Sequence, residues 1–210
     1  HTEATIAGAA AGLVASGRLA LEDGAERSKI VEVMCEDGRE SIALIDAALL
    51  VDDHPGSLLQ ADPEKLARIL LTRAEPSAVG LSPVGGLLMP CYAPDNFAVE
   101  VVGRPEPNPE ETGKTLRCPI SPGLYANVGI ESVDRVELGG EVRWTGPGLM
   151  AFDGDREIVL AEDESAILRV VRNGPWVINP DRALSAAAAQ ELFMDLGHWH
   201  DKRSGATGCC

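Results

Sequence analysis

The spacing of apolar positions predicts three helices, at the start, in the middle and at the end of the chain. In residues 2–17 (TEATIAGAAAGLVASG) apolar side chains recur at helical spacing. In residues 61–76 (ADPEKLARILLTRAEP) Asp62 is a typical N-cap and Pro63 a typical first helical residue. Residues 179–195 (NPDRALSAAAAQELFMD) repeat this kind of start, so we expect a closing helix there.

A hairpin is expected between the first two helices. Residues 29–53 contain two apolar runs separated by Asp37-Gly38, a pair typical of a tight turn between strands. The second strand, residues 41–51, is almost continuously apolar, which indicates cover on both faces. Asp46 lies inside this apolar strand.

After the second helix the pattern becomes a series of short strands. Residues 78–91 (AVGLSPVGGLLMPC) are expected to form a strand, a glycine-rich break and a strand, and residues 96–103 (NFAVEVVG) alternate. Further strands follow at intervals of about ten residues, which is typical of all-β architectures. The sequence thus predicts a mainly β fold with flanking helices (α+β), as one domain over residues 1–195 with a flexible tail, residues 196–210.

Composition narrows the classes of partner. The net charge is −15 over 210 residues, which disfavours nucleic acid and anionic membranes. No apolar run is long enough to cross a bilayer, and the first residues lack the basic start of a signal peptide, so a cytoplasmic location is expected. The five cysteines include no CxxC pair, and we predict no metal site.

The tripeptide Asp153-Gly154-Asp155 is the first candidate for chemistry. It lies between two apolar runs, so one interpretation is a hairpin turn and nothing more. The other interpretation is a carboxylate held at a rigid hairpin tip, where it can take a proton from a substrate hydroxyl or bind a metal. Of the two acids, Asp155 is expected to point further out of the turn, since Asp153 more often caps its own backbone.

The segment Ser82-Pro83-Val84-Gly85-Gly86 is the second candidate. Two glycines let a backbone approach a ligand closely, and they also simply make turns. Two weaker metal candidates are more typical of a solvated strand end and of a polar tail. They are the groups Asp52-Asp53-His54 and His198, His200, Cys209 and Cys210.

Residues 149–184 (LMAFDGDREIVLAEDESAILRVVRNGPWVINPDRAL) resemble the end of the NAD kinase and diacylglycerol kinase superfamily. In that superfamily an apolar strand precedes Asp-Gly-Gln or Asp-Gly-Glu, and strands separated by an acidic turn follow. The pair Ile45-Asp46 is similar to a pair in the lipid-kinase relatives, and residues 78–90 occupy the place of the NAD kinase substrate loop. The likeness covers most of residues 2–195 and includes the ATP-NAD kinase-like proteins of acetoin catabolism.

The resemblance implies the β-sandwich of an NAD kinase C-terminal domain, acting as the substrate-binding domain of an ATP-dependent phosphotransferase. ATP and Mg²⁺ are expected for the intact protein and neither for this chain alone, because Gly-Gly-Asp-Gly-Thr and Gly-Thr-x-Asn are absent. Asp155 matches the glutamate taken as general base in lipid kinases. Ser82, Gly85, Gly86 and Asp153 are the implied substrate-binding residues.

The implied partners are a small hydroxylated acceptor, with NAD as one candidate, and further copies of the chain in a homo-oligomer. A different function class stays open beside the kinase. The domain is in that case a non-catalytic ligand-binding or regulatory module linked to acetoin catabolism, or an assembly domain.

Overall fold

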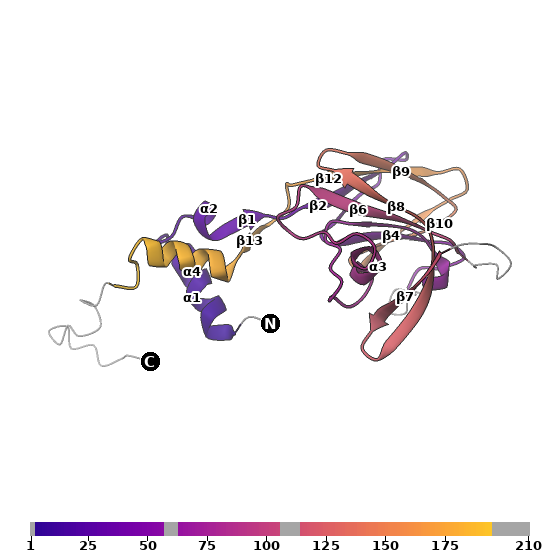
Figure 1. Ribbon diagram of the computed structural model, residues 1–210. Helices are drawn as coiled ribbons and strands as arrows, with labels where there is room; N and C mark the ends of the chain where they lie inside the picture. Colours follow the sequence, from indigo (N-terminus) through magenta and orange to yellow (C-terminus); the bar gives the residue numbers. More distant parts are fainter. Residues whose placement is uncertain (1–2, 57–62, 106–113, 195–210) are drawn as a thin grey trace. The chain divides into compact units, whose positions relative to one another are not determined.

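A computed structural model describes residues 3–56, 63–105 and 114–194 (Figure 1). The chain forms two compact units, one comprising Ser28–Gly174 and the other both terminal segments, up to Arg27 and from Pro175 onward. The first unit contains two antiparallel sheets. The seven-stranded sheet has the order β11 (Arg156–Leu160), β10 (Gly148–Phe152), β4 (Asp46–Leu50), β5 (Leu66–Leu71), β6 (Phe97–Gly103), β8 (Leu124–Glu137) and β7 (Lys114–Ser121). The four-stranded sheet has the order β3 (Glu40–Ala43), β2 (Ile30–Cys35), β12 (Ser165–Val171) and β9 (Glu141–Thr145).

The two sheets share one hydrophobic core. Trp144 and Leu168 from the four-stranded sheet are fully buried in one cluster with Leu70 and Phe152 from the seven-stranded sheet. Their neighbours in each strand point the other way, as the two-residue period of a strand requires. On the four-stranded sheet this second face is exposed, whereas on the seven-stranded sheet it is buried in a second core.

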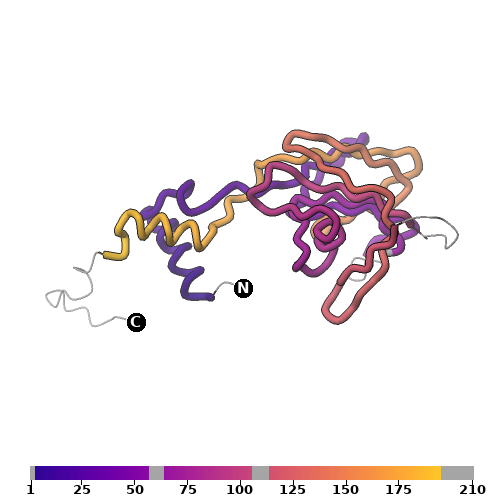
Figure 2. Tube along the Cα trace, in the orientation of Figure 1, coloured from indigo at the N-terminus to yellow at the C-terminus, as the bar shows by residue number. Residues whose placement is uncertain are grey.

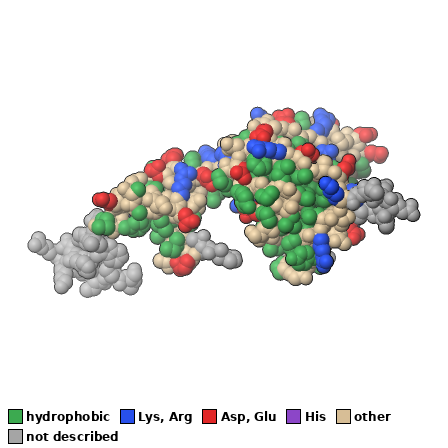
Figure 3. Space-filling view, viewed as in Figure 1, with side chains coloured by type: hydrophobic (Ala, Val, Ile, Leu, Met, Phe, Trp, Pro, Cys, Tyr) green, Lys and Arg blue, Asp and Glu red, His purple; other side chains and the backbone are tan. Residues whose placement is uncertain are grey.

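The second core is closed by the long strand β8 and by α3 (Ser82–Gly86). β8 pairs with β6 through its C-terminal part and with β7 through its N-terminal part, so the β7–β8 hairpin extends beyond the rest of the sheet (Figure 1). Figure 3 shows apolar side chains gathered over this part of the unit. The exposed ones there include Leu87, Leu124 and Tyr125.

The predicted hairpin at Asp37-Gly38 is confirmed, since β2 and β3 flank this turn and pair with each other. The single strand expected over residues 41–51 is wrong. The chain bends at residues 44–45, so that β3 belongs to the four-stranded sheet and β4 to the seven-stranded one. One apolar run therefore supplies both sheets.

The helix expected over residues 61–76 is wrong. Among the described residues of this range, only Pro63–Lys65 form a single 3₁₀ turn, and β5 follows directly. Ile69 and Leu71 pack in one core while Leu70 packs in the other. A strand buried on both faces has the same short apolar run as one side of a helix, so the tertiary environment overrode the capping signal.

The strand, break and strand expected over residues 78–91 are also wrong. The glycine-rich part is the short helix α3, and the only strand-like pairing in this range joins Cys91 to Ala74. Pro83 in the first turn of α3 favours the helix, because its fixed φ angle is already helical.

The second unit is built from both terminal segments (Figure 2). Its elements are α1 (Ala4–Ala15), α2 (Leu21–Gly24), β1 (Ala25–Arg27), β13 (Trp176–Ile178) and α4 (Pro180–Ala189). β1 pairs antiparallel with β13. Leu13, Leu19 and Ala187 are buried between the helices. The predicted first and last helices are confirmed, and Asn179 caps α4 by accepting a hydrogen bond from the N–H of Arg182 (3.1 Å).

The mainly β fold class with several antiparallel sheets and flanking helices is confirmed. The described residues of both compact units lie within residues 1–195, for which one domain is predicted, and that boundary stays a prediction. The predicted tail, residues 196–210, lies outside the described residues, as do His198, His200, Cys209 and Cys210. Within the described parts of the chain, no helix is both long and apolar enough to cross a membrane.

Candidate functional site

The turn predicted at Asp153-Gly154-Asp155 joins β10 to β11. Asp153 and Gly154 both have positive φ angles, 52° and 77°, and the N–H of Asp155 donates to the carbonyl of Phe152 at 3.1 Å. These are the features of the tight turns that match the twist of a hairpin. Asp153 occupies its left-handed position at a steric cost that glycine would not have.

The carboxylate of Asp153 holds the bend between β3 and β4. It accepts hydrogen bonds from the backbone N–H groups of Leu44 (2.8 Å), Ile45 (2.7 Å) and Asp46 (3.3 Å), which lie more than 100 residues earlier in the chain. Arg156 donates to its second oxygen at 2.9 Å. Both oxygens of Asp153 are thus engaged within the chain, and this carboxylate positions the bend.

Asp155 has a different environment from Asp153 although only one residue separates them. Its side chain is 70% exposed and forms an ion pair with Nε of Arg156 at 3.0 Å. The side chain of Asp153 is only 15% exposed. Asp155 is therefore the carboxylate of this turn that a solute can reach, as its expected outward position requires.

Asp46 adds a third carboxyl group to this corner. It is the first residue of β4, and burial raises its pKa to about 6, with a further contribution from the negative charge of Asp153. A carboxyl group that titrates near neutral pH suits proton transfer better than an ordinary aspartate does. In the sequence Asp46 is an acid inside an apolar run, and this position was the signal that could have identified it as a site residue.

Ser82, Gly85 and Gly86 are buried in α3 and contact their own chain. The hydroxyl of Ser82 donates to the carbonyl of Arg73 (3.0 Å) and accepts from the N–H of Glu75 (2.9 Å). A Cβ on Gly86 would lie 2.5 Å from the carbonyl carbon of Glu75. The glycines thus allow α3 to approach residues 71–76 closely, and a role in binding an acceptor stays a prediction.

The structure brings both candidate segments to one end of the seven-stranded sheet. Asp46 pairs with Leu71 in the β4–β5 register, and the Asp153 turn follows β10 on the other side of β4. The hydroxyl of Thr72 donates to the carbonyl of Leu44 at 2.8 Å. The two segments are therefore connected through the bend at residues 44–46 and the chain that leaves β5.

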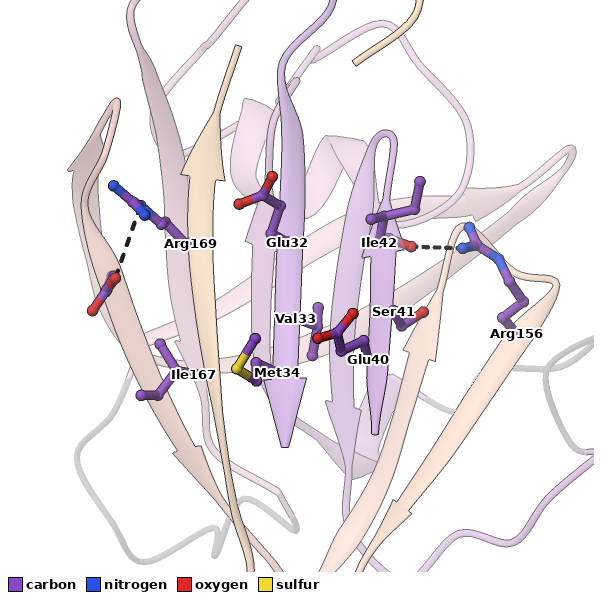
Figure 4. A pocket seen from close by; sticks show the side chains of 10 residues that line it. Glu32, Val33, Met34, Glu40, Ser41, Ile42, Arg156, Ile167 and Arg169 are labelled. Carbon is purple, nitrogen blue, oxygen red and sulfur yellow. Dashed lines mark hydrogen bonds and ion pairs between the residues drawn. The ribbon is translucent and has the colours of Figure 1, made fainter. Parts of the chain in front are cut away.

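A groove of about 660 Å³ lies on the exposed face of the four-stranded sheet (Figure 4). Arg156 reaches this groove from the turn, where its Nη1 donates to the carbonyl of Ile42 at 2.7 Å. Apolar and charged side chains alternate along its wall, among them Glu32, Met34, Glu40, Ile42, Ile167 and Arg169. Sequence reasoning missed both Arg156 and the groove, because the lining residues come from five separate strands.

The candidate metal residues Asp52, Asp53 and His54 gather no further ligands from the described part of the chain. Asp53 lies 3.6 Å from Nζ of Lys65 and 3.7 Å from Nδ1 of His54. In residues 3–56, 63–105 and 114–194, no three His, Cys, Asp or Glu side chains come together as a metal site would require.

Comparison with known proteins identifies the family. Residues 29–173 match the model of the acetoin catabolism protein X C-terminal domain. The chain is also 32% identical over 201 residues to the acetoin catabolism protein X of Cupriavidus necator. That match covers 92% of this chain and 55% of the relative, so the chain spans about half the length of the relative it matches. The matched range includes both sheets and the whole corner around Asp153, and the chain therefore belongs to the family of acetoin catabolism protein X C-terminal domains.

Proposed function

We propose that this chain is the substrate-binding domain of an ATP-dependent, NAD kinase-like phosphotransferase that acts on a hydroxyl acceptor in acetoin catabolism. The observation that carries the proposal is the corner at one end of the large sheet, where Asp153 accepts from the N–H of Asp46 and the neighbouring Asp155 is exposed. The resemblance of residues 149–184 to the NAD kinase and diacylglycerol kinase superfamily supports the phosphotransferase, and the name of the Cupriavidus relative supports the link to acetoin catabolism.

Each acid has a separate role in this proposal. Asp153 fixes the bend at residues 44–46 and so sets the position of Asp46. Asp155, the exposed acid, takes the proton from the acceptor hydroxyl, and Asp46 is the alternative proton acceptor. Phosphoryl transfer needs positioning and charge neutralisation more than covalent chemistry from the protein, so a correctly placed carboxylate is a sufficient contribution from this domain.

The described residues of this chain do not form a site for ATP, and they contain no cluster of three acidic side chains that would hold Mg²⁺. The sequence has no phosphate-binding glycine loop, and the guanidinium at the corner, Arg156, is bonded to Asp153 and Asp155. Among the described residues, the corner therefore contributes no cationic group of its own to hold the phosphates of ATP. No step of the proposal runs through ATP on this chain, whose part is confined to the acceptor.

The test is a panel of small hydroxylated acceptors, NAD included, incubated with the intact gene product and labelled ATP. The expected result is transfer of label to one acceptor class, with activity that rises through pH 6 if Asp46 is the proton acceptor. Absence of transfer to every acceptor, together with saturable binding of one of them, overturns the phosphotransferase and leaves a ligand-binding module.

A non-catalytic ligand-binding or regulatory module in acetoin catabolism is the second candidate. It is favoured by the hydrogen bonds of Asp153, since both of its oxygens are used to hold the chain itself. In this case the corner only stabilises the bend at residues 44–46. The intact gene product is then expected to bind its ligand without transferring phosphate from ATP.

A further inference from the structure

Lys29 is a buried lysine immediately before β2. The residue is 3% exposed, and its ammonium group lies among backbone carbonyls and one thiol. Nζ donates to the carbonyl of Phe97 (2.6 Å), to the carbonyl of Tyr92 (3.0 Å) and to Sγ of Cys91 (3.2 Å). These three acceptors fix the position of the amine. None of them is a carboxylate, so the described residues give it no bonded acid.

Cys91 is held as firmly as the lysine. It is fully buried, and its backbone exchanges two hydrogen bonds with Ala74, of 2.8 and 2.9 Å. Its Sγ also lies 3.1 Å from the carbonyl of Phe97. The amine and the thiol, 62 residues apart in sequence, therefore face each other from two anchored segments.

The environment favours transfer of a proton between these two groups. Burial lowers the pKa of the Lys29 ammonium, while the contact with Cys91 partly offsets that effect. Burial also raises the pKa of the Cys91 thiol, and the hydrogen bond and charge of Lys29 oppose this shift. The hydrogen bond of 3.2 Å gives the proton a direct path between the two groups, and its transfer interconverts an ammonium–thiolate pair and a neutral amine–thiol pair.

We propose that Lys29 and Cys91 form an oxidative modification site, where a peroxide converts the hydrogen-bonded pair into a covalent sulfur–nitrogen crosslink. In the first step the Cys91 thiolate attacks an oxygen of hydrogen peroxide and the O–O bond breaks. The departing hydroxide takes a proton from the Lys29 ammonium, which leaves sulfenic acid, water and a neutral amine. In the second step the neutral Lys29 amine attacks that sulfur, the S–O bond breaks, and a second water leaves. Thiol, amine and one hydrogen peroxide thus give a sulfenamide and two waters.

The geometry matters because it selects one product over others. A sulfenic acid normally condenses with a second thiol to form a disulfide or is oxidised further. At Cys91 the nearest nucleophile is the Lys29 amine, already at 3.2 Å, so ring closure needs only a small movement. The crosslink would tie the start of β2 to the chain that follows α3 and, through Ala74, to residues 71–76 at the candidate site.

The chain contains its own controls. Cys35 and Cys118 are buried free thiols like Cys91, and in the described parts of the chain neither thiol has a hydrogen bond to a lysine. Burial raises the pKa of Cys118 to about 11, which keeps it in the unreactive thiol form. Equal burial with and without an amine neighbour isolates the effect of Lys29.

The test treats the 210-residue chain with hydrogen peroxide, in a Cys209→Ser/Cys210→Ser background so that these two thiols do not compete. Free thiols are then alkylated in denaturant and peptides are sequenced by mass spectrometry. The expected product joins the Lys29 and Cys91 peptides, is two hydrogens lighter than their sum, and separates on treatment with dithiothreitol. Cys35 and Cys118 are expected to remain free thiols during the peroxide treatment and therefore to be alkylated afterwards.

The variants Lys29→Arg and Cys91→Ser must both abolish the linked peptide. Peptide sequencing of the unsubstituted pair decides the outcome even if either variant folds poorly. Alkylation of Cys91 to the same extent as Cys35 after peroxide overturns the proposal, and so does oxidation of Cys91 to sulfinic acid without a link to Lys29. The outcome is independent of any phosphotransferase activity, because no ATP or acceptor is present.

Discussion

Two segments carry the sequence features of a binding site, and the structure uses their polar groups differently. At residues 153–155 one carboxylate holds a distant bend and the other is 70% exposed. In α3 the hydroxyl of Ser82 and the glycines serve contacts within the chain. The same residue types thus lead to an accessible acid in one place and to close packing in the other. The difference arises because α3 packs closely against residues 71–76, whereas the Asp155 side chain faces solvent.

Removing the Asp153 carboxylate should have the largest effect on stability. Asp153→Ala leaves the N–H groups of Leu44, Ile45 and Asp46 without their acceptor and is expected to lower the free energy of unfolding by about 3 kcal/mol. The measurement is urea denaturation followed by tryptophan fluorescence. Asp163→Ala is the matched control, because Asp163 also has a positive φ angle (64°) and is exposed. Equal losses in the two variants would show that Asp153 does not hold the bend.

A methyl group on Gly86 tests the packing of α3. Gly86→Ala places a Cβ against the backbone of Glu75 and Pro76, and the expected loss of unfolding free energy is about 2 kcal/mol. Gly12→Ala in α1 is the control, since nothing lies within 4 Å of its added Cβ, and it should not lower the midpoint. An unchanged midpoint of urea denaturation for Gly86→Ala would mean that this segment is open enough to admit a ligand.

Asp46 should weaken the fold at neutral pH, since its pKa is raised to about 6 from 3.8. Between these two values the folded chain binds the proton more tightly than the unfolded chain, so stability falls as the pH rises. Asp46→Asn should therefore stabilise the protein by about 1–2 kcal/mol at pH 8 and by almost nothing at pH 3.5. Thermal unfolding at both pH values measures this difference. A pH-independent effect of the substitution would contradict the burial of the charge.

Asp155 should contribute least to stability. Its ion pair with Arg156 is exposed, and such pairs contribute little, so Asp155→Asn should change the free energy of unfolding by less than about 0.5 kcal/mol. Chemical denaturation beside the Asp153→Ala variant gives the comparison directly. A loss approaching that of Asp153→Ala would make Asp155 a structural residue.

The features that sequence alone could predict depend on a few neighbouring residues. The turn at Asp37-Gly38 and the turn at Asp153-Gly154 follow from the backbone freedom of glycine and of aspartate. The closing helix follows from Asn179 and Pro180, a cap and a first residue. In each case the decisive contacts lie within four residues.

The features that sequence could not predict depend on distant partners. Pro63–Lys65 carry a typical helix start, yet β5 follows them because Ile69 to Leu71 have an apolar layer on either side. The Asp153 carboxylate meets the N–H of Leu44 across 109 residues, a distance at which no local pattern operates. The candidate site was therefore predictable as a turn, but its link to Asp46 and Arg156 was not.

The central claim is that the exposed acid of the Asp153 corner serves phosphoryl transfer and not the fold. The most direct measurement compares kcat of the intact gene product, its Asp155→Asn variant and its Asp163→Asn variant, with labelled ATP and the acceptor found in the panel. The account predicts a loss of about 100-fold or more for Asp155→Asn, as expected on removal of a general base, and a normal rate for Asp163→Asn. Equal rates for the two variants at pH 7 would contradict it.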